Sequence, residues 1–178
     1  PGNKAPARLS FHDVGLPSIV IDWVGWATFG FGATVALTAI MVMAQLAGLS
    51  RMDLPLMLGT IFVGDPDRAR VVGFLVHLGI GQLFALVYAG SFAALGFATW
   101  WLGALFGAFH GVAALTVGMP LLPGIHPRMA SERTGARLTA VLEPPGLFAL
   151  NYGRETPLVT LVAHVTYGLL LGIFLGLS

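Results

Sequence analysis

The chain has no cysteine and very little charge. The missing thiols exclude disulfides, thiolate zinc sites, iron–sulfur clusters and haem attached through cysteine. Only 10% of the 178 residues are charged, against roughly 25% in an ordinary soluble domain. A net charge of +1 provides no basic stripe that could follow the phosphates of a nucleic acid. These absences exclude a disulfide-stabilised domain, an ordinary soluble domain and a nucleic-acid-binding protein.

Motifs that mark enzymes are also missing. The sequence contains no Gly-x-Ser-x-Gly nucleophile turn, no His-Glu-x-x-His zinc motif, no phosphate-binding loop and no dinucleotide-binding glycine fingerprint. Its apolar segments hold no paired carboxylates, which di-iron bundles and ion-coupled carriers need. We therefore expect the chain not to be an enzyme.

Long apolar segments make up most of what is present. Hydrophobic residues account for 56% of the chain, and the mean hydropathy is +0.84. Because a membrane-spanning helix needs about 20 residues, the uncharged stretch 71–127 must contain two helices joined by a turn, which we place at 96–99. The sequence predicts an all-α integral membrane bundle of four transmembrane helices. We expect these helices near 23–48, 71–95, 99–122 and 157–177.

The distribution of basic residues predicts an orientation. We expect an N-terminal arm over 1–22 and one transmembrane domain over 23–178, with interfacial loops at 49–70 and 123–156. Seven basic residues lie on the side of the two loops: Arg51, Arg68, Arg70, Arg128, Arg133, Arg137 and Arg154. Lys4 and Arg8 lie on the other side, where Trp23, Trp26, Trp100 and Trp101 form an interfacial belt. The positive-inside rule predicts cytoplasmic loops and periplasmic termini in a bacterial inner membrane.

Glycine is the residue that shapes the predicted packing. The chain has 24 glycines, and two predicted helices repeat glycine every four residues. These ladders are Gly103, Gly107 and Gly111 in the third helix, and Gly168, Gly172 and Gly176 in the fourth. Within lipid, helices associate where small residues let their backbones approach closely. The ladders predict a tight bundle or a flat face offered to another protein's helix.

Three histidines, His77, His110 and His164, lie inside the predicted spans, where ionisable residues usually face the protein interior. Counting 1.5 Å per residue from the loop side places His77 and His164 about 9 and 10 Å deep, and His110 about 18 Å deep. We therefore expect His77 and His164 to share a level that His110 does not. Each of these two histidines has a glycine four residues after it, which suggests two duplicated helical hairpins.

The histidines have three open interpretations. Facing imidazoles on His77 and His164 can hold a b-type haem or a metal ion, with His110 or His126 as a lesser partner. Neutral histidines can instead hydrogen-bond to a carbonyl, a Ser or Thr hydroxyl or a Gln on a neighbouring helix, and Gln45 and Gln82 are available. The third interpretation is proton or substrate handling.

The segment from Gly59 to the C-terminus resembles small bacterial four-helix membrane proteins of unknown function. Four stretches show the resemblance: Gly64-Asp65-Pro66-Asp67-Arg68-Ala69-Arg70, His126-Pro127-Arg128-Met129, Glu143-Pro144-Pro145-Gly146 and Asn151-Tyr152-Gly153-Arg154. This resemblance implies a four-helix membrane fold and no particular activity.

The sequence favours a non-catalytic accessory subunit that packs into a larger, energy-transducing bacterial membrane complex. Its expected partners are membrane lipids and other integral membrane subunits, with no nucleic acid. The alternative is a membrane protein that binds b-type haem or a metal ion through His77, His164 and His110. A third interpretation is a conduit for a small molecule or an ion.

Overall fold

The computed structural model describes residues 21–131 and 141–177. The expected N-terminal arm therefore lies almost entirely outside the described residues, as does the middle of the second loop. Within the described residues the chain is helical, with one isolated β-bridge between Met129 and Leu142 and no extended strand.

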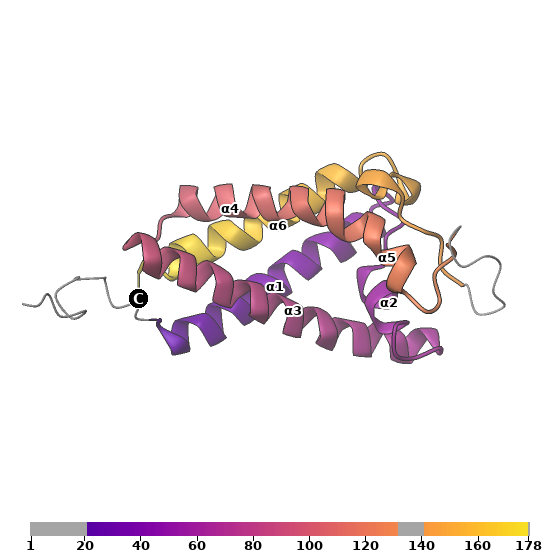
Figure 1. Ribbon diagram of the computed structural model, residues 1–178, viewed down its shortest axis with the longest axis horizontal. Coiled ribbons are helices and arrows are strands. Elements are labelled where there is room, and N and C mark those ends of the chain that lie inside the picture. The colour runs from indigo at the N-terminus through magenta and orange to yellow at the C-terminus, as the bar shows by residue number, and fades with distance from the viewer. Residues whose placement is uncertain (1–20, 132–140, 178) are drawn as a thin grey trace, which may run out of the picture.

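Four helices are long and apolar enough to cross a membrane (Figure 1). They are α1 (Trp23–Leu46), α3 (Pro66–Leu95), the α4–α5 segment from Trp100 to Ile125, and α6 (Thr156–Phe174). The predicted all-α bundle of four membrane-length helices is confirmed.

Short polar side chains fix where the helices begin. The Asp22 carboxylate accepts a bond from the Gly25 N–H at 2.9 Å, and the Asp65 carboxylate accepts one from the Arg68 N–H at 2.9 Å. Because Asp65 provides this cap and Pro66 suits a first helical turn, α3 begins at Pro66 and not near residue 71. Gly96, with a φ of 78°, ends α3, so the predicted turn at 96–99 is confirmed.

A short helix, α2 (Leu54–Gly59), lies within the first predicted loop. Asp53 caps it by accepting a bond from the Leu56 N–H at 2.9 Å. Its backbone lies directly on α3, since a Cβ added to Gly73 would overlap the Pro55 carbonyl. This loop therefore folds back as a packed helix against the bundle.

The third membrane helix contains a widened turn. α4 (Trp100–Ala113) continues into a π-helical turn, η2 (Ala114–Gly118), and then into α5 (Met119–Ile125). Pro120 has no N–H to bond the Thr116 carbonyl, and the Met119 N–H bonds Ala114, five residues back. The wide turn and Pro123 inside α5 change the helix direction, so α5 bends away from the α4 axis (Figure 1).

The glycine ladders of α4 and α6 face each other inside the chain. A Cβ added at Gly103 would overlap the Gly168 carbonyl, and one at Gly107 would overlap the His164 carbonyl. The two helices therefore run antiparallel with their backbones in contact, as close packing within lipid requires. These glycines serve packing within the chain and are not available to another protein's helix.

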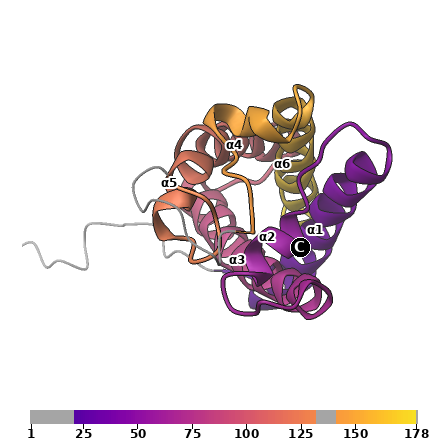
Figure 2. The same cartoon turned by 90° about the vertical axis from the view of Figure 1, so that its right-hand side faces the viewer.

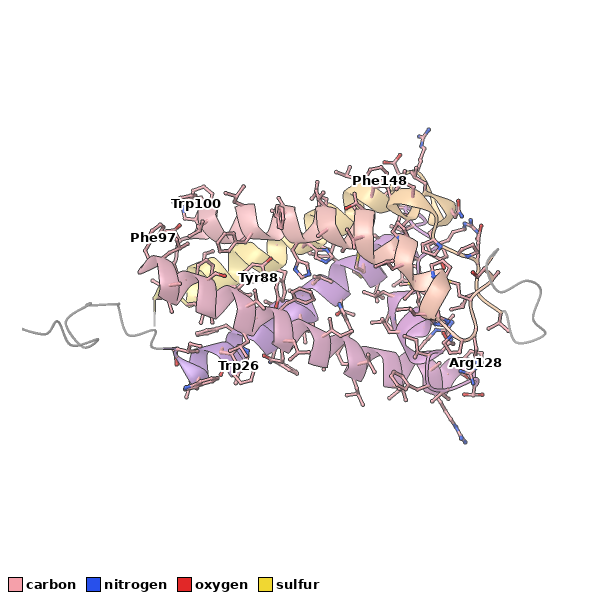
Figure 3. All side chains as sticks on the ribbon, viewed as in Figure 1. Trp26, Tyr88, Phe97, Trp100, Arg128 and Phe148 are labelled. Atoms are coloured by element: carbon pink, nitrogen blue, oxygen red, sulfur yellow. The ribbon has the colours of Figure 1, made fainter. Side chains whose placement is uncertain are left out.

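The helices α3 and α4 diverge from the turn that joins them, with α5 and α2 at the open end (Figures 1 and 2). Aromatic side chains bridge the gap: the rings of Tyr88 and Phe92 lie 5.8 and 5.6 Å from the ring of Phe106. Figure 3 shows Tyr88 between the helices, nearer to the end marked by Trp100 than to the end marked by Arg128. The bundle is thus closed on the α4–α6 side and separated between α3 and α4.

Candidate functional site

A cavity of about 440 Å³ lies between the diverging helices. All four membrane helices and α2 contribute to its wall, which is mostly apolar. Its lining includes Thr34, His77, Ile80, Phe84, His110, His164 and Tyr167. The wide turn η2 forms part of this wall, and π-helical turns are frequent at functional sites. The structure therefore brings all three predicted intramembrane histidines to one cavity.

The ring of His77 on α3 is fixed by Thr38 on α1. The His77 Nδ1 lies 2.8 Å from the Thr38 hydroxyl oxygen, and that hydroxyl donates its hydrogen to the Thr34 carbonyl at 2.8 Å. Because a hydroxyl has one hydrogen, a Thr38 hydroxyl that donates to the Thr34 carbonyl accepts from Nδ1–H of His77 in the first bond. Nε2 of the neutral ring then has a free lone pair.

The ring of His164 on α6 is fixed in the same tautomer by its own helix. Its Nδ1 lies 2.8 Å from the Thr160 carbonyl oxygen, and a carbonyl can only accept. Nδ1–H of His164 is therefore the donor, and Nε2 has the lone pair. Among the described residues, no hydrogen-bond partner approaches Nε2 of His77 or His164. The partner of His77 is thus a threonine hydroxyl on a neighbouring helix, one of the expected kinds, whereas His164 bonds a carbonyl of its own helix. Neither ring bonds Gln45 or Gln82.

His110 on α4 lies against His164, which corrects the predicted levels. The two rings meet edge to face with their centroids 4.7 Å apart, so His110 is not deeper than His164. The prediction was wrong because it counted depth from helix ends assumed to lie in one plane. The glycine contacts set the register of α4 on α6, and the wide turn moves the end of α5 out of line.

Two tyrosines that sequence reasoning missed complete the site. The Tyr167 hydroxyl donates to the Gly81 carbonyl at 2.6 Å, which ties α6 to α3. The Tyr88 hydroxyl lies 3.4 Å from His110 Nδ1, and its ring packs edge to face on Tyr167. Tyr167 lies three residues after His164, so the helical period already places the two side chains on one face.

The arrangement limits which metal or haem sites are feasible. Across residues 21–131 and 141–177, no group of three or more His, Asp and Glu side chains lies close enough to hold a metal ion. The contact between the rings of His110 and His164 leaves no room for a porphyrin between them. The pairing of His77 with His164 as ligands stays a prediction.

His126 has a structural role, so the prediction that it is a lesser ligand is wrong. Its Nδ1 accepts from the Arg128 N–H at 3.1 Å, and its Nε2 lies 2.9 Å from the Met57 carbonyl. Both ring nitrogens are therefore occupied by backbone. The Arg128 guanidinium also donates to the Thr60 carbonyl at 2.6 Å, so this loop holds the C-terminal end of α2. Burial lowers the pKa of His126, and the nearby Arg128 charge lowers it further, against the opposing bond to Met57.

The second loop is tied to the first by Arg51. Its guanidinium bonds the Asn151 carbonyl and lies 3.3 Å from the Glu143 carboxylate. The Tyr152 hydroxyl donates to the Glu143 carbonyl, and burial raises the pKa of Tyr152 to about 12. These contacts connect the two loops, and none of these four residues lines the histidine cavity.

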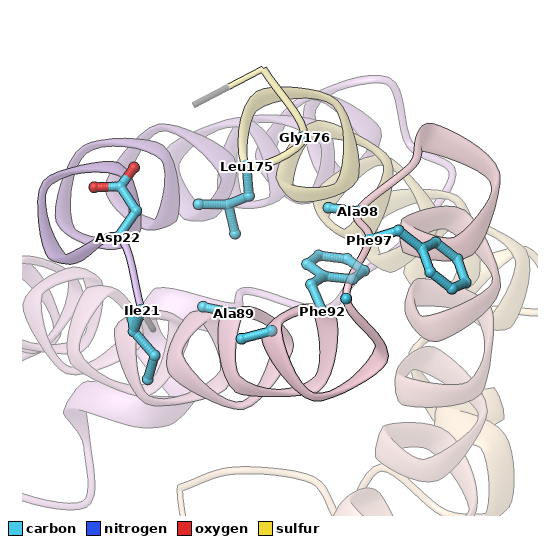
Figure 4. Close-up of a pocket in the computed structure, with 10 residues that line it drawn as sticks. Ile21, Asp22, Ala89, Phe92, Phe97, Ala98, Leu175 and Gly176 are labelled. Carbon is cyan, nitrogen blue, oxygen red and sulfur yellow. The ribbon is translucent and has the colours of Figure 1, made fainter. Parts of the chain in front are cut away.

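A second cavity, of about 450 Å³, lies at the opposite end of the bundle (Figure 4). Its lining includes Ile21, Ala89, Phe92, Phe97 and Leu175, which are apolar. The acidic lining residue is Asp22, whose carboxylate caps α1. This cavity therefore offers fewer polar groups that could bind a ligand than the histidine-lined cavity does.

Comparison with protein-family models, with curated proteins and with solved structures finds no match to this chain.

Proposed function

We propose that the chain is a multi-pass membrane protein that binds a small ligand in the histidine-lined cavity. His77 and His164 contact the ligand through Nε2. The observation that supports this proposal is the fixed tautomer of both rings, because each Nδ1–H is bonded within the bundle and each Nε2 lacks a partner. Ligand-binding histidines are usually oriented by such a bond from the other ring nitrogen.

The cavity suits a small ligand in size and character. Its volume of about 440 Å³ falls within the roughly 300–1,000 Å³ of small-molecule sites. Apolar walls with a few polar atoms are also typical of such sites. An Nε2 lone pair can coordinate the iron of a b-type haem or a metal ion, or it can accept a hydrogen bond from an organic ligand.

Purification in a mild detergent tests this function. The absorbance spectrum, the metal content and a mass spectrum of the extracted organic molecules would identify what the protein retains. We expect His77→Phe and His164→Phe to lose the retained molecule. Leu83→Phe, on the exposed face of α3, is the matched control and should keep it. A ligand retained equally by all four proteins would overturn the assignment to this cavity.

A second candidate function is an accessory subunit of a larger, energy-transducing complex. It is favoured by open glycines on the outer surface: a Cβ added to Gly32, Gly79 or Gly90 would meet nothing within 4 Å. Gly79 and Gly90 lie eleven residues apart, so they share one side of α3 and leave space for a neighbouring helix. Affinity purification of native protein should then recover larger membrane subunits, and Gly79→Leu should release them. A lone chain would overturn this candidate.

The proposed location is the bacterial inner membrane, with the loops 49–70 and 123–156 cytoplasmic and the termini periplasmic. This orientation rests on the excess of arginine in the loops. Because the chain contains no cysteine, single cysteines can be labelled without background. Asp67→Cys should react with an impermeant maleimide only after cell lysis, and Phe97→Cys should react in intact spheroplasts. The reverse pattern would invert the topology.

A further inference from the structure

We infer that the cavity binds the reduced, hydroxyl-bearing form of an alkyl-substituted aromatic ring, a molecule of the hydroquinone class. This inference rests on the proposed function and specifies its ligand. The feature behind it is the pattern of hydrogen-bond acceptors in the cavity wall, combined with an aromatic slot that opens between α3 and α4.

The fixed polar atoms of the cavity are acceptors. Nε2 of His77 and Nε2 of His164 each have a lone pair and no hydrogen. Thr34 and Tyr167 are each 1% exposed, and their hydroxyls already bond the Gly30 carbonyl at 2.7 Å and the Gly81 carbonyl at 2.6 Å. The two Nε2 atoms are therefore the acceptors left open to a ligand. A ligand that satisfies these atoms must therefore bring O–H or N–H donors.

His110 can act either as a hydrogen-bond donor or as an acceptor beside the Nε2 atoms of His77 and His164. Its Nδ1 faces the Tyr88 hydroxyl at 3.4 Å, and that hydroxyl can either donate or accept. His110 therefore does not select the oxidation state of the ligand, whereas His77 and His164 do. A quinone offers carbonyl acceptors to two lone pairs, while a hydroquinone offers hydroxyl donors.

The aromatic residues form a site for a flat ring. Phe84 lies on the His110 ring with centroids 4.0 Å apart, and Tyr88 and Tyr167 continue the aromatic wall behind it. Offset and edge-to-face packing of this kind favours an aromatic ligand over a saturated one.

The position of the cavity explains why an alkyl substituent is expected. Ile80 and Phe84 line the cavity on α3 and are 36% and 40% exposed, so these side chains do not close it off. The cavity is therefore accessible between α3 and α4, at the depth of the apolar helix surface. A cavity of about 440 Å³ can enclose a substituted ring, while an alkyl chain extends outward into the lipid.

The test compares three decyl compounds that differ only in hydrogen bonding. Decylhydroquinone donates two bonds, its dimethyl ether donates none, and decylbenzoquinone only accepts. Binding to the purified protein in lipid nanodiscs is measured under anaerobic conditions by calorimetry. The ¹⁵N resonances of the histidine Nε2 atoms report contact directly. We expect decylhydroquinone to bind at least about tenfold more tightly than either analogue, since each 1.4 kcal/mol of lost hydrogen bonding is tenfold in affinity.

Substitutions connect this preference to the two histidines. His77→Phe and His164→Phe should each reduce the preference to about twofold or less, and Leu83→Phe should leave it unchanged. Thr38→Val is a milder variant, because it keeps the shape of the side chain and removes the acceptor of the His77 Nδ1–H. The His77 ring is then free to present Nε2–H, so this variant should bind decylbenzoquinone more tightly than the wild type does.

The outcomes separate the inference from the function on which it rests. Equal binding of decylhydroquinone and its dimethyl ether would overturn the inference and leave a cavity for apolar ligands. A preference that persists in both phenylalanine variants would also overturn it. Failure of all three compounds to bind would also overturn the inference, whereas the proposed function is overturned only if His77→Phe and His164→Phe retain the purified protein's own ligand as the wild type does.

Discussion

Substitution of Gly107 by alanine should weaken the bundle, although alanine is the better helix former. An added Cβ would overlap the His164 carbonyl and would lie 2.8 Å from the Val165 Cα, where ordinary contact is 3.4–4 Å. Both neighbours are backbone atoms, so relief requires α4 and α6 to separate. Overpacking of this kind costs about 1–3 kcal/mol.

Gly79→Ala is the matched control because a Cβ there meets nothing within 4 Å. Alanine gains about 0.8–1.0 kcal/mol of helix propensity over glycine at either site. This gain cancels between the two variants, so the comparison isolates the cost of contact. We expect Gly107→Ala to be less stable than Gly79→Ala by about 1–3 kcal/mol, a factor of about 5 to 150 in the unfolding equilibrium.

The free energy of unfolding can be measured in mixed micelles by titration with sodium dodecyl sulfate, followed by tryptophan fluorescence and far-ultraviolet circular dichroism. Coincident transitions would support a two-state analysis. If Gly107→Ala and Gly79→Ala unfolded with equal free energies, the backbone contact between α4 and α6 would be refuted. The register that places His110 against His164 would then be refuted with it.

Three further predictions concern single contacts. Tyr167→Phe removes the bond to the Gly81 carbonyl and should lower the free energy of unfolding by about 1 kcal/mol, as the same micelle titration would show. Asp65→Ala removes the cap of α3 and should cost about 0.5–2 kcal/mol, with increased amide hydrogen exchange confined to the first turn. His126 has a pKa below its ordinary value of 6.5 in the folded protein, so the unfolded chain binds a proton there first as the pH falls. The contribution of His126 to the free energy of unfolding should therefore be complete above pH 6.5 and decline as the pH falls toward the folded-state pKa. This pH dependence should be absent in His126→Gln.

The helices followed from the sequence because their signals are local. An apolar stretch of sufficient length predicts each span, and Gly96 with Thr99 predicts the turn at 96–99 between the second and third spans. The start of α3 was predicted five residues late because a charge-free window ignores the Asp65 cap. Asp65 and Pro66 together were the signal that would have corrected it.

The arrangement around the histidines depended on contacts that the sequence does not display. His110 meets His164 because glycine backbones set the register of two helices that lie far apart in the chain. The tautomer of His77 depends on Thr38, 39 residues away. The sequence predicted His126 as a lesser ligand, yet its partners are the carbonyl of Met57 and the N–H of Arg128. Backbone groups are present at every residue, so composition cannot reveal which of them a histidine binds.

The π-helical turn at Ala114–Gly118 also determines which chain lengths the third membrane helix tolerates. An α-helix advances about 100° per residue, so one extra residue would normally rotate everything beyond it to another face. The wide turn accommodates such a residue locally, and Met119 and Leu122 in α5 still pack against the core that Leu102 helps to form in α4. Deletion of one residue here would produce a regular helix whose two halves face different directions. The irregular turn is therefore what keeps the two halves of this helix in phase.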